Sequence, residues 1–415
     1  MRTIEEMGER ARDAAAVLAA AGSREKDRGL AAIAAALREH TGEILAANGL
    51  DTARAAEAGT RPAMLDRLTL TGERVEAIAR AVEEIIALPD PVGRVDRGGV
   101  RPNGLSITRV RVPLGVVGII YEARPNVTAD AAALCLKSGN ACILRGGKEA
   151  ISTNLALAGI MGRALEQAGL PAGAVQLMEN TDRESARQMM RANGLIDVLI
   201  PRGGAGLIQA VVEGSTVPVI QTGVGNCHVY VDSPCDLGMA VEIIENAKCS
   251  RPSVCNAAET LLVHREVAEA FLPMAKAALD RYSVQLRGCP EARRILGEGV
   301  LPATGEDYAA EFNDFILAVR VVDSIEEAIR HIRRYSTGHS EAIVTGDYGH
   351  SQQFIRQVDA AAVYVNASTR FTDGGEFGLG AEIGISTQKL HARGPMGLEE
   401  LTTTKYVVLG SGQIR

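Results

Sequence analysis

The feature that most constrains the fold is a change of pattern at Gly115. From there, short apolar runs alternate with amphipathic segments such as 152–167 and 182–192. Apolar strands that alternate with helices are typical of a parallel sheet covered on both faces. The first series of predicted strands is GVVGIIY (115–121), ACILR (141–145), VQLM (175–178), VLIP (198–201) and VPVIQ (217–221).

A second series of the same kind starts near Val229, after the Gly-rich stretch TGVGNC (222–227). Its predicted strands are TLLVH (260–264), FILAVRVV (315–322), AIVT (342–345) and AAVYVN (361–366). The chain has 415 residues, enough for two or three domains at roughly 150 residues each. The sequence therefore predicts an α/β protein with two parallel-sheet domains.

The segments outside these two series have other patterns. The first ~90 residues are predicted to be helical, since apolar residues such as Val75, Ile78 and Val82 recur at helical spacing. Residues 90–103 are rich in Gly, Pro and Arg and are predicted to be a connection. Residues 104–112 alternate as in an exposed strand, and TTTKYVVLG (402–410) is predicted to be a last strand. Exposed strand edges invite pairing, so we expect both to mediate self-association.

Composition excludes several classes of protein. The net charge is −7 without long blocks of like charge, which argues against a nucleic-acid partner. No run of about 18 apolar residues predicts a membrane span, and the N-terminal segment lacks the basic start of a signal peptide. The seven cysteines are scattered and odd in number, which favours a reducing, cytoplasmic location. No paired metal-ligand spacing occurs, so we expect no structural metal.

Two Gly-rich stretches follow predicted strands and suit phosphate groups. RGGAGL (202–207) opens a predicted helix, whose first N–H groups at Gly203, Gly204 and Gly206 can hold a phosphate. The strand 141–145 ends in Arg145, and Lys148 follows two glycines later; basic residues at such a strand end favour the 2′-phosphate of NADP. A structural turn and a solvated strand end are the alternative interpretations of these two segments.

Cysteine is the residue with which an enzyme that reduces an activated acyl group would form a thioester. Cys255 lies in SRPSVCNAAETLLVH, in a loop between a predicted helix and a strand, where catalytic residues collect. Cys135 and Cys142 fall in apolar patterns and are predicted to be core. The remaining candidates lie beside a strand, at a helix end or in a loop: Cys227, Cys235, Cys249 and Cys289.

The Gly-rich stretches, the basic strand end and the Cys255 loop follow one another along the chain in the order found in a known superfamily. The chain resembles the aldehyde dehydrogenase superfamily over nearly its full length, in the segments PLGVVGIIYEARPN, SGNACILRGGKEA, LIPRGGAGL, VIQTGVGNCHVYVD, SVCNAAETLLVH and EFNDFILAVRVV. The core HIRRYSTGHSEAI (331–343) and the segment that starts at VNASTRF (365–371) are similar to those members that reduce γ-glutamyl phosphate to glutamate 5-semialdehyde, the second step of proline biosynthesis from glutamate.

The resemblance implies an aldehyde dehydrogenase-like α/β fold. Two Rossmann-like parallel-sheet domains are expected, together with a small β oligomerisation arm. The cofactor-binding domain would comprise residues 1–103 and 113–225, and the catalytic domain residues 226–380. Residues 104–112 and 400–415 would form the arm and tail of a homo-oligomer.

The resemblance also implies roles for single residues. It makes Cys255 the nucleophile that forms the thioester. It implies NADPH as the cofactor, with Arg145 at the adenosine ribose and Lys148 nearby. The helix start from Gly203 to Gly206 would lie at the phosphates, and Glu311 would hold the nicotinamide ribose.

The chain departs from the family at two positions. Hydrolytic members carry a glutamate that activates water where this chain has Gln221. Their oxyanion-binding Asn falls on Ala123, so Asn126, just after Pro125, is the substitute we expect. The sequence therefore leaves the identity of the oxyanion-binding residue open. It also leaves the oligomeric state open.

Binding of an anionic substrate requires cations. Arg124 and Arg370 are candidates, because each lies in a loop just beyond a predicted strand end; surface or structural arginines are the alternative. His339 and Glu341 lie in the 331–343 core, and they either bind substrate or brace a loop.

The sequence disfavours two other functions. A hydrolytic aldehyde dehydrogenase is disfavoured by Gln221, and a non-catalytic binding protein is disfavoured by the intact Cys255 and basic strand end. The pathway implies functional coupling to glutamate 5-kinase, which would supply the acyl phosphate.

Overall fold

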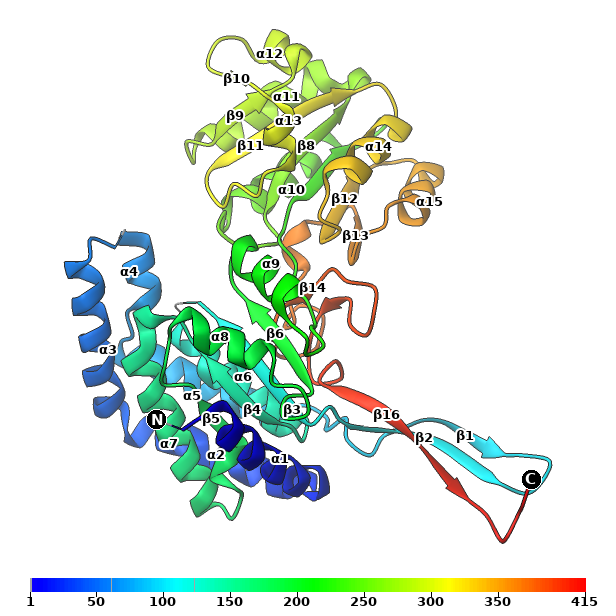
Figure 1. Cartoon of the computed structure of the whole chain (residues 1–415). Coiled ribbons are helices and arrows are strands. Elements are labelled where there is room, and N and C mark those ends of the chain that lie inside the picture. Colours follow the sequence, from blue (N-terminus) through cyan, green and yellow to red (C-terminus); the bar gives the residue numbers. More distant parts are fainter. Residues whose placement is uncertain (1, 61, 123) are drawn as a thin grey trace. The chain divides into compact units, whose positions relative to one another are not determined.

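The computed structural model describes residues 2–60, 62–122 and 124–415. The chain divides into two compact units (Figure 1). Unit 1 contains residues 1–221, 378–384 and 396–415, and unit 2 contains residues 222–377 and 385–395. The change of unit after Gln221 falls slightly before the boundary expected at 225, and the chain crosses between the units again after Phe377. The roles of the two units in cofactor binding and catalysis stay predictions at this point.

Unit 1 is built on a four-stranded parallel sheet in the order β5-β4-β3-β6. Every residue of the central strand β3 is buried, as expected for a strand covered on both faces. The strands are β3 (Val116–Tyr121), β4 (Ala141–Arg145), β5 (Val175–Leu177) and β6 (Val198–Arg202).

One predicted strand of this series is wrong. Of residues 217–221, only Val219 forms an isolated bridge, with Leu199 of β6. Pro218 has no N–H to donate to a ladder, although its carbonyl accepts from the Leu199 N–H at 2.8 Å. The Ile220 N–H donates to the Leu199 carbonyl oxygen at 2.9 Å, so the apolar run adds a single bridge at the edge of the sheet and does not form a strand.

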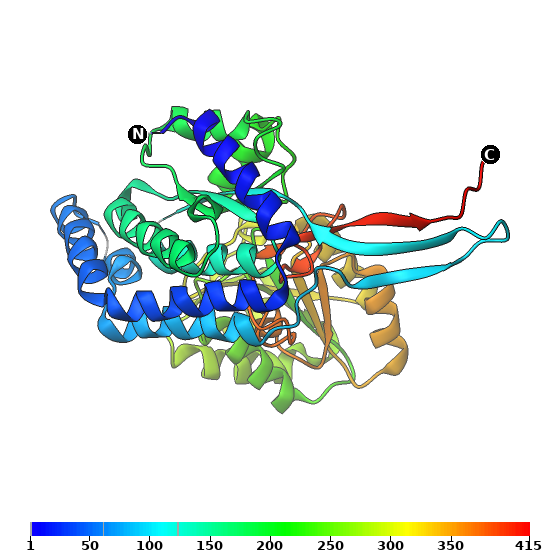
Figure 2. The same ribbon diagram turned by 90° about the horizontal axis from the view of Figure 1, so that it is seen from below.

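Helices cover the sheet of unit 1. Leu30, Ile33 and Leu37 form an apolar stripe on α2, and α5 presents a similar stripe that includes Val75 and Ile78. The two helices pack side by side, as Figure 2 shows. The helices of unit 1 are α1 (Ile4–Ala20), α2 (Ser23–Glu39), α3 (Thr41–Glu57), α4 (Pro62–Leu68), α5 (Gly72–Ala87), α6 (Pro125–Lys137), α7 (Ile151–Gln167), α8 (Arg183–Met190) and α9 (Ala205–Gly214), with short 3₁₀ turns η1 (Lys148–Ala150) and η2 (Ala172–Ala174).

An antiparallel arm extends from unit 1, as both whole-chain views show (Figures 1 and 2). Its strands β1 (Val95–Val100), β2 (Ser106–Pro113) and β16 (Thr402–Leu409) pair in the order β1-β2-β16. The prediction of a connection over 90–103 is wrong for residues 95–100, which form a hairpin with β2. The polar and glycine residues of β1 hide its strand pattern, and backbone pairing with β2 decides its structure.

Unit 2 is built on a seven-stranded parallel sheet in the order β10-β9-β11-β8-β7-β12-β13. A two-stranded ribbon, β14 (Ile385–Ser386) with β15 (Gly394–Pro395), completes the unit. The sheet strands are β7 (Cys227–Val231), β8 (Ala258–His264), β9 (Gln285–Gly288), β10 (Leu301–Pro302), β11 (Ile316–Val322), β12 (Ser340–Val344) and β13 (Ala362–Val365). Its helices are α10 (Leu237–Cys249), α11 (Arg265–Asp280), α12 (Pro290–Leu296), α13 (Gly305–Ala309), α14 (Ile325–Tyr335) and α15 (Tyr348–Gln357), with the 3₁₀ turn η3 (Thr369–Phe371).

Both faces of this sheet are covered by helices. Leu261 and Val263 of β8 pack in one core cluster with α10 and α11, while Leu262 between them packs in another with α14 and α15. Successive side chains of a strand point to opposite faces, so the two clusters lie on opposite sides of the sheet. The predicted α/β fold with two parallel sheets is confirmed. Over the parts of the chain that the structure describes, no helix combines the length and apolarity that crossing a membrane would need.

Candidate active site

Cys255 lies in the loop between the end of α10 and the start of β8, and its side chain is half-buried. The main chain of this loop rests on Gly225. A Cβ at Gly225 would lie 1.5 Å from the Cys255 carbonyl oxygen, so only glycine fits there. The Gly225 N–H donates to Oε1 of Glu311 at 2.8 Å. Gly225 therefore contacts both Glu311 and the main chain of the Cys255 loop.

Cys227 holds the same loop from the first residue of β7. Its Sγ donates to the Cys255 carbonyl oxygen at 3.2 Å. Burial raises the pKa of the Cys227 thiol well above its usual value, so the group keeps its proton and acts as a donor.

The other cysteines of the chain are buried, shifted in pKa or engaged in capping a helix. Burial raises the pKa of both Cys235 and Cys249 to about 11, which disfavours their thiolates near neutral pH. The prediction that Cys135 and Cys142 belong to the core is confirmed, since both are fully buried. Sγ of Cys289 accepts the N–H of Ala292 at 3.5 Å and so caps α12.

Arg370 contacts the residue that follows Cys255. Its Nη1 donates to Oδ1 of Asn256, and its Nε donates to Oγ of Ser250 at 3.0 Å. Nδ2 of Asn256 in turn donates to the carbonyl oxygens of Arg370 at 3.2 Å and Thr372 at 3.0 Å. These bonds fix the guanidinium relative to the Cys255 loop. Burial, and then the nearby Arg251, lower the pKa of Arg370.

Sequence reasoning missed Asn256. Its only signal was a polar residue next to Cys255 at the start of an apolar strand, and its partners lie more than 100 residues away along the chain.

His339 directly precedes β12, Glu341 is its second residue, and both side chains are fully buried. Nδ1 of His339 lies 2.8 Å from Oγ of Ser340, and burial lowers the pKa of His339 to about 4. Glu341 accepts from the His228 N–H at 2.9 Å and from Oγ of Ser336. The contacts of Glu341 tie the turn before β12 to β7 and therefore brace a loop.

Arg145, the last residue of β4, is half-buried. Its Nη2 donates to the carbonyl oxygens of Thr181 at 2.5 Å and Asp182 at 3.0 Å. Its Nε is buried without a hydrogen-bond partner among the residues with described positions. Lys148 begins η1 and is exposed. A buried donor in need of an acceptor and an exposed cation fit a phosphate, which is the group that distinguishes NADP from NAD.

The Gly-rich start of α9 is exposed at Gly203, Gly204 and Gly206, and Gly204 is the N-cap. A Cβ at Gly203 would lie 2.6 Å from the carboxyl carbon of Glu122, whereas a Cβ at Gly206 would meet no described heavy atom within 4 Å. The N–H groups at this helix start can donate hydrogen bonds to an anion.

Arg124 and Asn126 begin α6, and both are exposed. Nδ2 of Asn126 donates to Oδ2 of Asp130 at 3.0 Å, and burial raises the pKa of Asp130 to about 6. Ala123, where hydrolytic relatives would carry the oxyanion residue, lies outside the described residues.

The structure therefore separates the predicted residues into two groups. Cys255, Glu311 and Arg370 belong to unit 2 and are linked through Gly225 and Asn256. The remaining candidates belong to unit 1: Arg124, Asn126, Arg145, Lys148, Gly203, Gly204 and Gly206.

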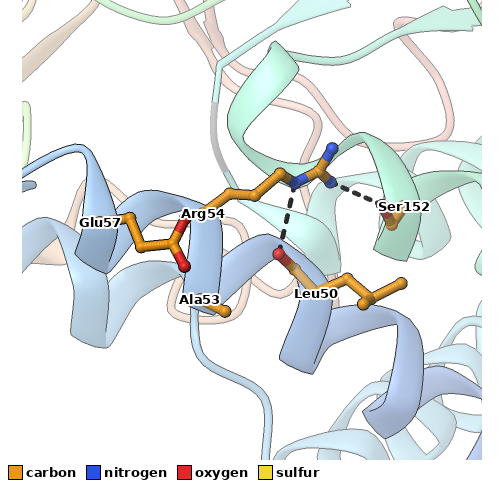
Figure 3. Close-up of a pocket in the computed structure, with 5 residues that line it drawn as sticks. All are labelled: Leu50, Ala53, Arg54, Glu57 and Ser152. Atoms are coloured by element: carbon orange, nitrogen blue, oxygen red, sulfur yellow. Dashed lines mark hydrogen bonds between the residues drawn. The ribbon is translucent and has the colours of Figure 1, made fainter.

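A surface hollow and possible metal ligands among the described residues are the remaining features to compare with these two groups, and neither includes a predicted site residue. A hollow between α3 and α7 is lined by Leu50, Ala53, Arg54, Glu57 and Ser152 (Figure 3). The Arg54 guanidinium there donates to Oγ of Ser152 at 2.6 Å and to the Leu50 carbonyl oxygen at 3.3 Å, as the dashed lines show. In the ranges 2–60, 62–122 and 124–415, no group of three or more His, Cys, Asp or Glu residues could hold a metal ion.

Fold and sequence both define the class of protein. The sequence model of the aldehyde dehydrogenase family matches residues 2–290 and 314–407. A crystal structure of an acetylating aldehyde dehydrogenase from Geobacillus thermoglucosidasius has the same fold, with a TM-score of 0.72 at 19 % identity over 99 % of this chain and 97 % of that one.

Two relatives are far more similar. The γ-glutamyl phosphate reductase of Heliobacterium modesticaldum is 62 % identical over 408 residues, 98 % of each chain. The crystal structure of the γ-glutamyl phosphate reductase of Thermotoga maritima covers 100 % of both chains, with 50 % identity and a TM-score of 0.98. The chain therefore belongs to the aldehyde dehydrogenase family and, within it, to the γ-glutamyl phosphate reductases.

Proposed function

We propose that the protein reduces γ-glutamyl phosphate to glutamate 5-semialdehyde and phosphate, with NADPH as reductant and a thioester on Cys255 as intermediate. This is the second step of proline biosynthesis from glutamate. The observation that carries the proposal is the fixed Cys255 loop, with the Arg370 guanidinium bonded to the next residue.

The first step forms the thioester. The Cys255 thiolate attacks the acyl carbon and forms a carbon–sulfur bond, the bond between that carbon and the bridging oxygen breaks, and inorganic phosphate leaves with this oxygen. Arg370 supplies positive charge for the anionic substrate, and Arg124 is the second cation we propose for it. The Cys255 N–H and the Asn126 amide are proposed to stabilise the oxyanion, where one donor is typically worth ~100- to 1000-fold in rate.

The second step reduces the thioester. A reduced nicotinamide, when bound, supplies a hydride to an acyl carbon. The chain's own contribution is to bind and orient: Arg145 and Lys148 would hold the 2′-phosphate, and the N–H groups of 203–206 the remaining phosphates. Glu311 would accept from the nicotinamide ribose. Cleavage of the carbon–sulfur bond at Cys255 then releases the aldehyde and restores the thiolate.

The arm is proposed to join copies of the chain into a homo-oligomer. Tyr406, Val408 and Leu409 of β16 are exposed in the single chain, and β1 and β16 form the open edges of the arm. Pairing within a closed assembly would cover such edges.

Because acyl phosphates hydrolyse readily, we also propose functional coupling in the cytoplasm to glutamate 5-kinase.

The reverse reaction tests the function. With glutamate 5-semialdehyde, the protein is expected to reduce NADP⁺ only when inorganic phosphate is present. NADP⁺ reduction without phosphate, with glutamate as product, would instead show a hydrolytic aldehyde dehydrogenase. No turnover under either condition would favour a non-catalytic protein.

A further inference from the structure

Two fully buried charges lie at the base of the Cys255 loop. Lys248 is in the last turn of α10, Glu259 is the second residue of β8, and both side chains are 0 % exposed. Nζ of Lys248 lies 2.6 Å from Oε2 of Glu259. The ion pair therefore closes the chain segment that contains Cys255, and the proposed reaction uses neither residue.

Burial opposes both charges of this pair. It raises the pKa of Glu259 to about 7 and lowers the pKa of Lys248. Buried ion pairs commonly contribute little net stability, because desolvation offsets the attraction between the charges. A contribution to position rather than to stability is therefore the effect to look for.

The second oxygen of Glu259 reaches another segment. Oε1 accepts the backbone N–H of Asn313 at 3.2 Å. Asn313 has a φ of 55°, in the left-handed region that Asn tolerates better than most residues. It lies two residues after Glu311, so the carboxylate of Glu259 holds the turn that carries Glu311.

These contacts form a closed ring. Glu259 binds the turn at Asn313, Glu311 of that turn binds the Gly225 N–H, and Gly225 lies directly against the Cys255 main chain. Cys255 is followed in sequence by the strand that begins at Ala258 and carries Glu259. A shift of Glu259 would consequently move both sides of the ring.

We propose that Glu259, paired with Lys248, is a positioning residue that sets Glu311 relative to the Cys255 thiol. The inference rests on the proposed roles of Cys255 and Glu311. One carboxylate orients two parts of the site, and the acceptor for the Asn313 N–H is the essential feature.

Two double variants separate this role from a structural one. K248M/E259Q and K248M/E259M both remove the buried charges with little change in volume, so neither leaves an unpaired ion. Only the glutamine keeps a side-chain carbonyl to accept the Asn313 N–H. The first readout is the alkylation rate of Cys255 by iodoacetamide in nucleotide-free protein, with the modified peptide identified by mass spectrometry. The others are KM for NADPH, kcat and the melting temperature.

K248M/E259Q is expected to stay within about threefold of wild type in alkylation rate and in KM for NADPH. K248M/E259M is expected to change the alkylation rate severalfold and to lower kcat/KM by roughly 10- to 100-fold, the scale of small misplacements in active sites. Equal kinetics in the two variants would overturn the proposal, whether both match wild type or both fall. If the double variants do not fold, Glu259→Asp replaces them: it keeps the charge but shortens the side chain by one methylene, so it should change the alkylation rate of Cys255 severalfold, and wild-type kinetics in this variant would overturn the proposal.

Failure of the proposed function would be recognised separately. In that case wild type would show no phosphate-dependent turnover, and the alkylation rates of Cys255 alone would decide the positioning role.

Discussion

Three candidate residues of unit 2 are held more firmly than Lys148 and Gly206 of unit 1. In unit 2, Cys255, Glu311 and Arg370 are bound by backbone and side-chain hydrogen bonds from distant segments. In unit 1, Lys148 and Gly206 are exposed, and a side chain at Gly206 would meet open space among the described residues. The difference matches the proposed tasks, because bond-making groups need geometry within about 0.5 Å, whereas charged groups can act on a phosphate over a longer range. Variants in the two units should therefore differ in the size and kind of their effects.

The largest effect is expected for Cys255→Ala. Removal of a covalent nucleophile typically lowers kcat by roughly 10⁴- to 10⁶-fold, while NADPH binding, measured by fluorescence, should persist. Cys235→Ala, in the same unit, is the control and should keep wild-type turnover. More than about a tenth of wild-type activity in Cys255→Ala would refute the assignment of the nucleophile.

The next effect is a gain of function. Gln221 stands where hydrolytic relatives carry a glutamate, and an amide cannot accept a proton from water at physiological pH. Gln221→Glu should create phosphate-independent oxidation of glutamate 5-semialdehyde to glutamate, since general-base assistance is typically worth ~100- to 10,000-fold. Phosphate-dependent turnover should fall, because the new charge repels the incoming anion.

NADP⁺ reduction with and without phosphate, with glutamate quantified, measures both effects. Gln221→Asn, which adds no base, is the matched control. A folded, cofactor-binding Gln221→Glu variant without phosphate-independent turnover above wild type would show that Gln221 does not protect the thioester.

A matched pair of glycine substitutions compares the units directly. Gly225→Ala puts a Cβ 1.5 Å from the Cys255 carbonyl oxygen, so the loop must move, and kcat should fall about 100-fold. Gly206→Ala has no such neighbour among the described atoms and should change kcat less than about threefold. Similar losses in both variants would contradict the contrast between the crowded Gly225 of unit 2 and the open Gly206 of unit 1.

Arg145→Ala should alter cofactor choice more than turnover. A charge-assisted hydrogen bond contributes about 1.5–3 kcal/mol, so the preference for NADPH over NADH should fall by roughly 10- to 100-fold in kcat/KM. Arg163→Ala, on the exposed surface of α7, should leave the ratio unchanged. An unaltered ratio in Arg145→Ala would show that another group recognises the phosphate.

Deletion of residues 402–415 should have the smallest effect on the chemistry and a clear effect on assembly. The deletion removes β16 and uncovers one edge of β2. Light scattering should then show a smaller species than full-length protein at the same concentration. The double variant Tyr406→Ser/Val408→Ser tests the same edge at unchanged chain length. If both the deletion and the double variant keep the particle mass of the full-length protein, the arm does not mediate assembly.

Local patterns predicted much of the fold. Buried strands such as β3 and β4 and amphipathic helices such as α5 and α7 are encoded within a few neighbouring residues, so the periodicity of apolar residues predicts them. The two segments that were predicted wrongly depend on backbone pairing, which the periodicity of apolar residues does not capture. β1 is a strand because β2 pairs with it, and residues 217–221 form one bridge rather than a strand because Pro218 cannot donate.

The sequence by itself determined the class of protein, the parallel-sheet architecture and the identity of the candidate nucleophile, because motifs and periodic patterns are local properties of the chain. Only the tertiary structure brought Gly225 against Cys255, Asn256 onto Arg370, and Glu259 onto Lys248 and Asn313. Apart from the Lys248–Glu259 pair, these contacts join residues tens to more than a hundred positions apart. Hydrogen-bond distances and close contacts of this kind exist only once the sheet of unit 2 has assembled, so no local pattern can contain them.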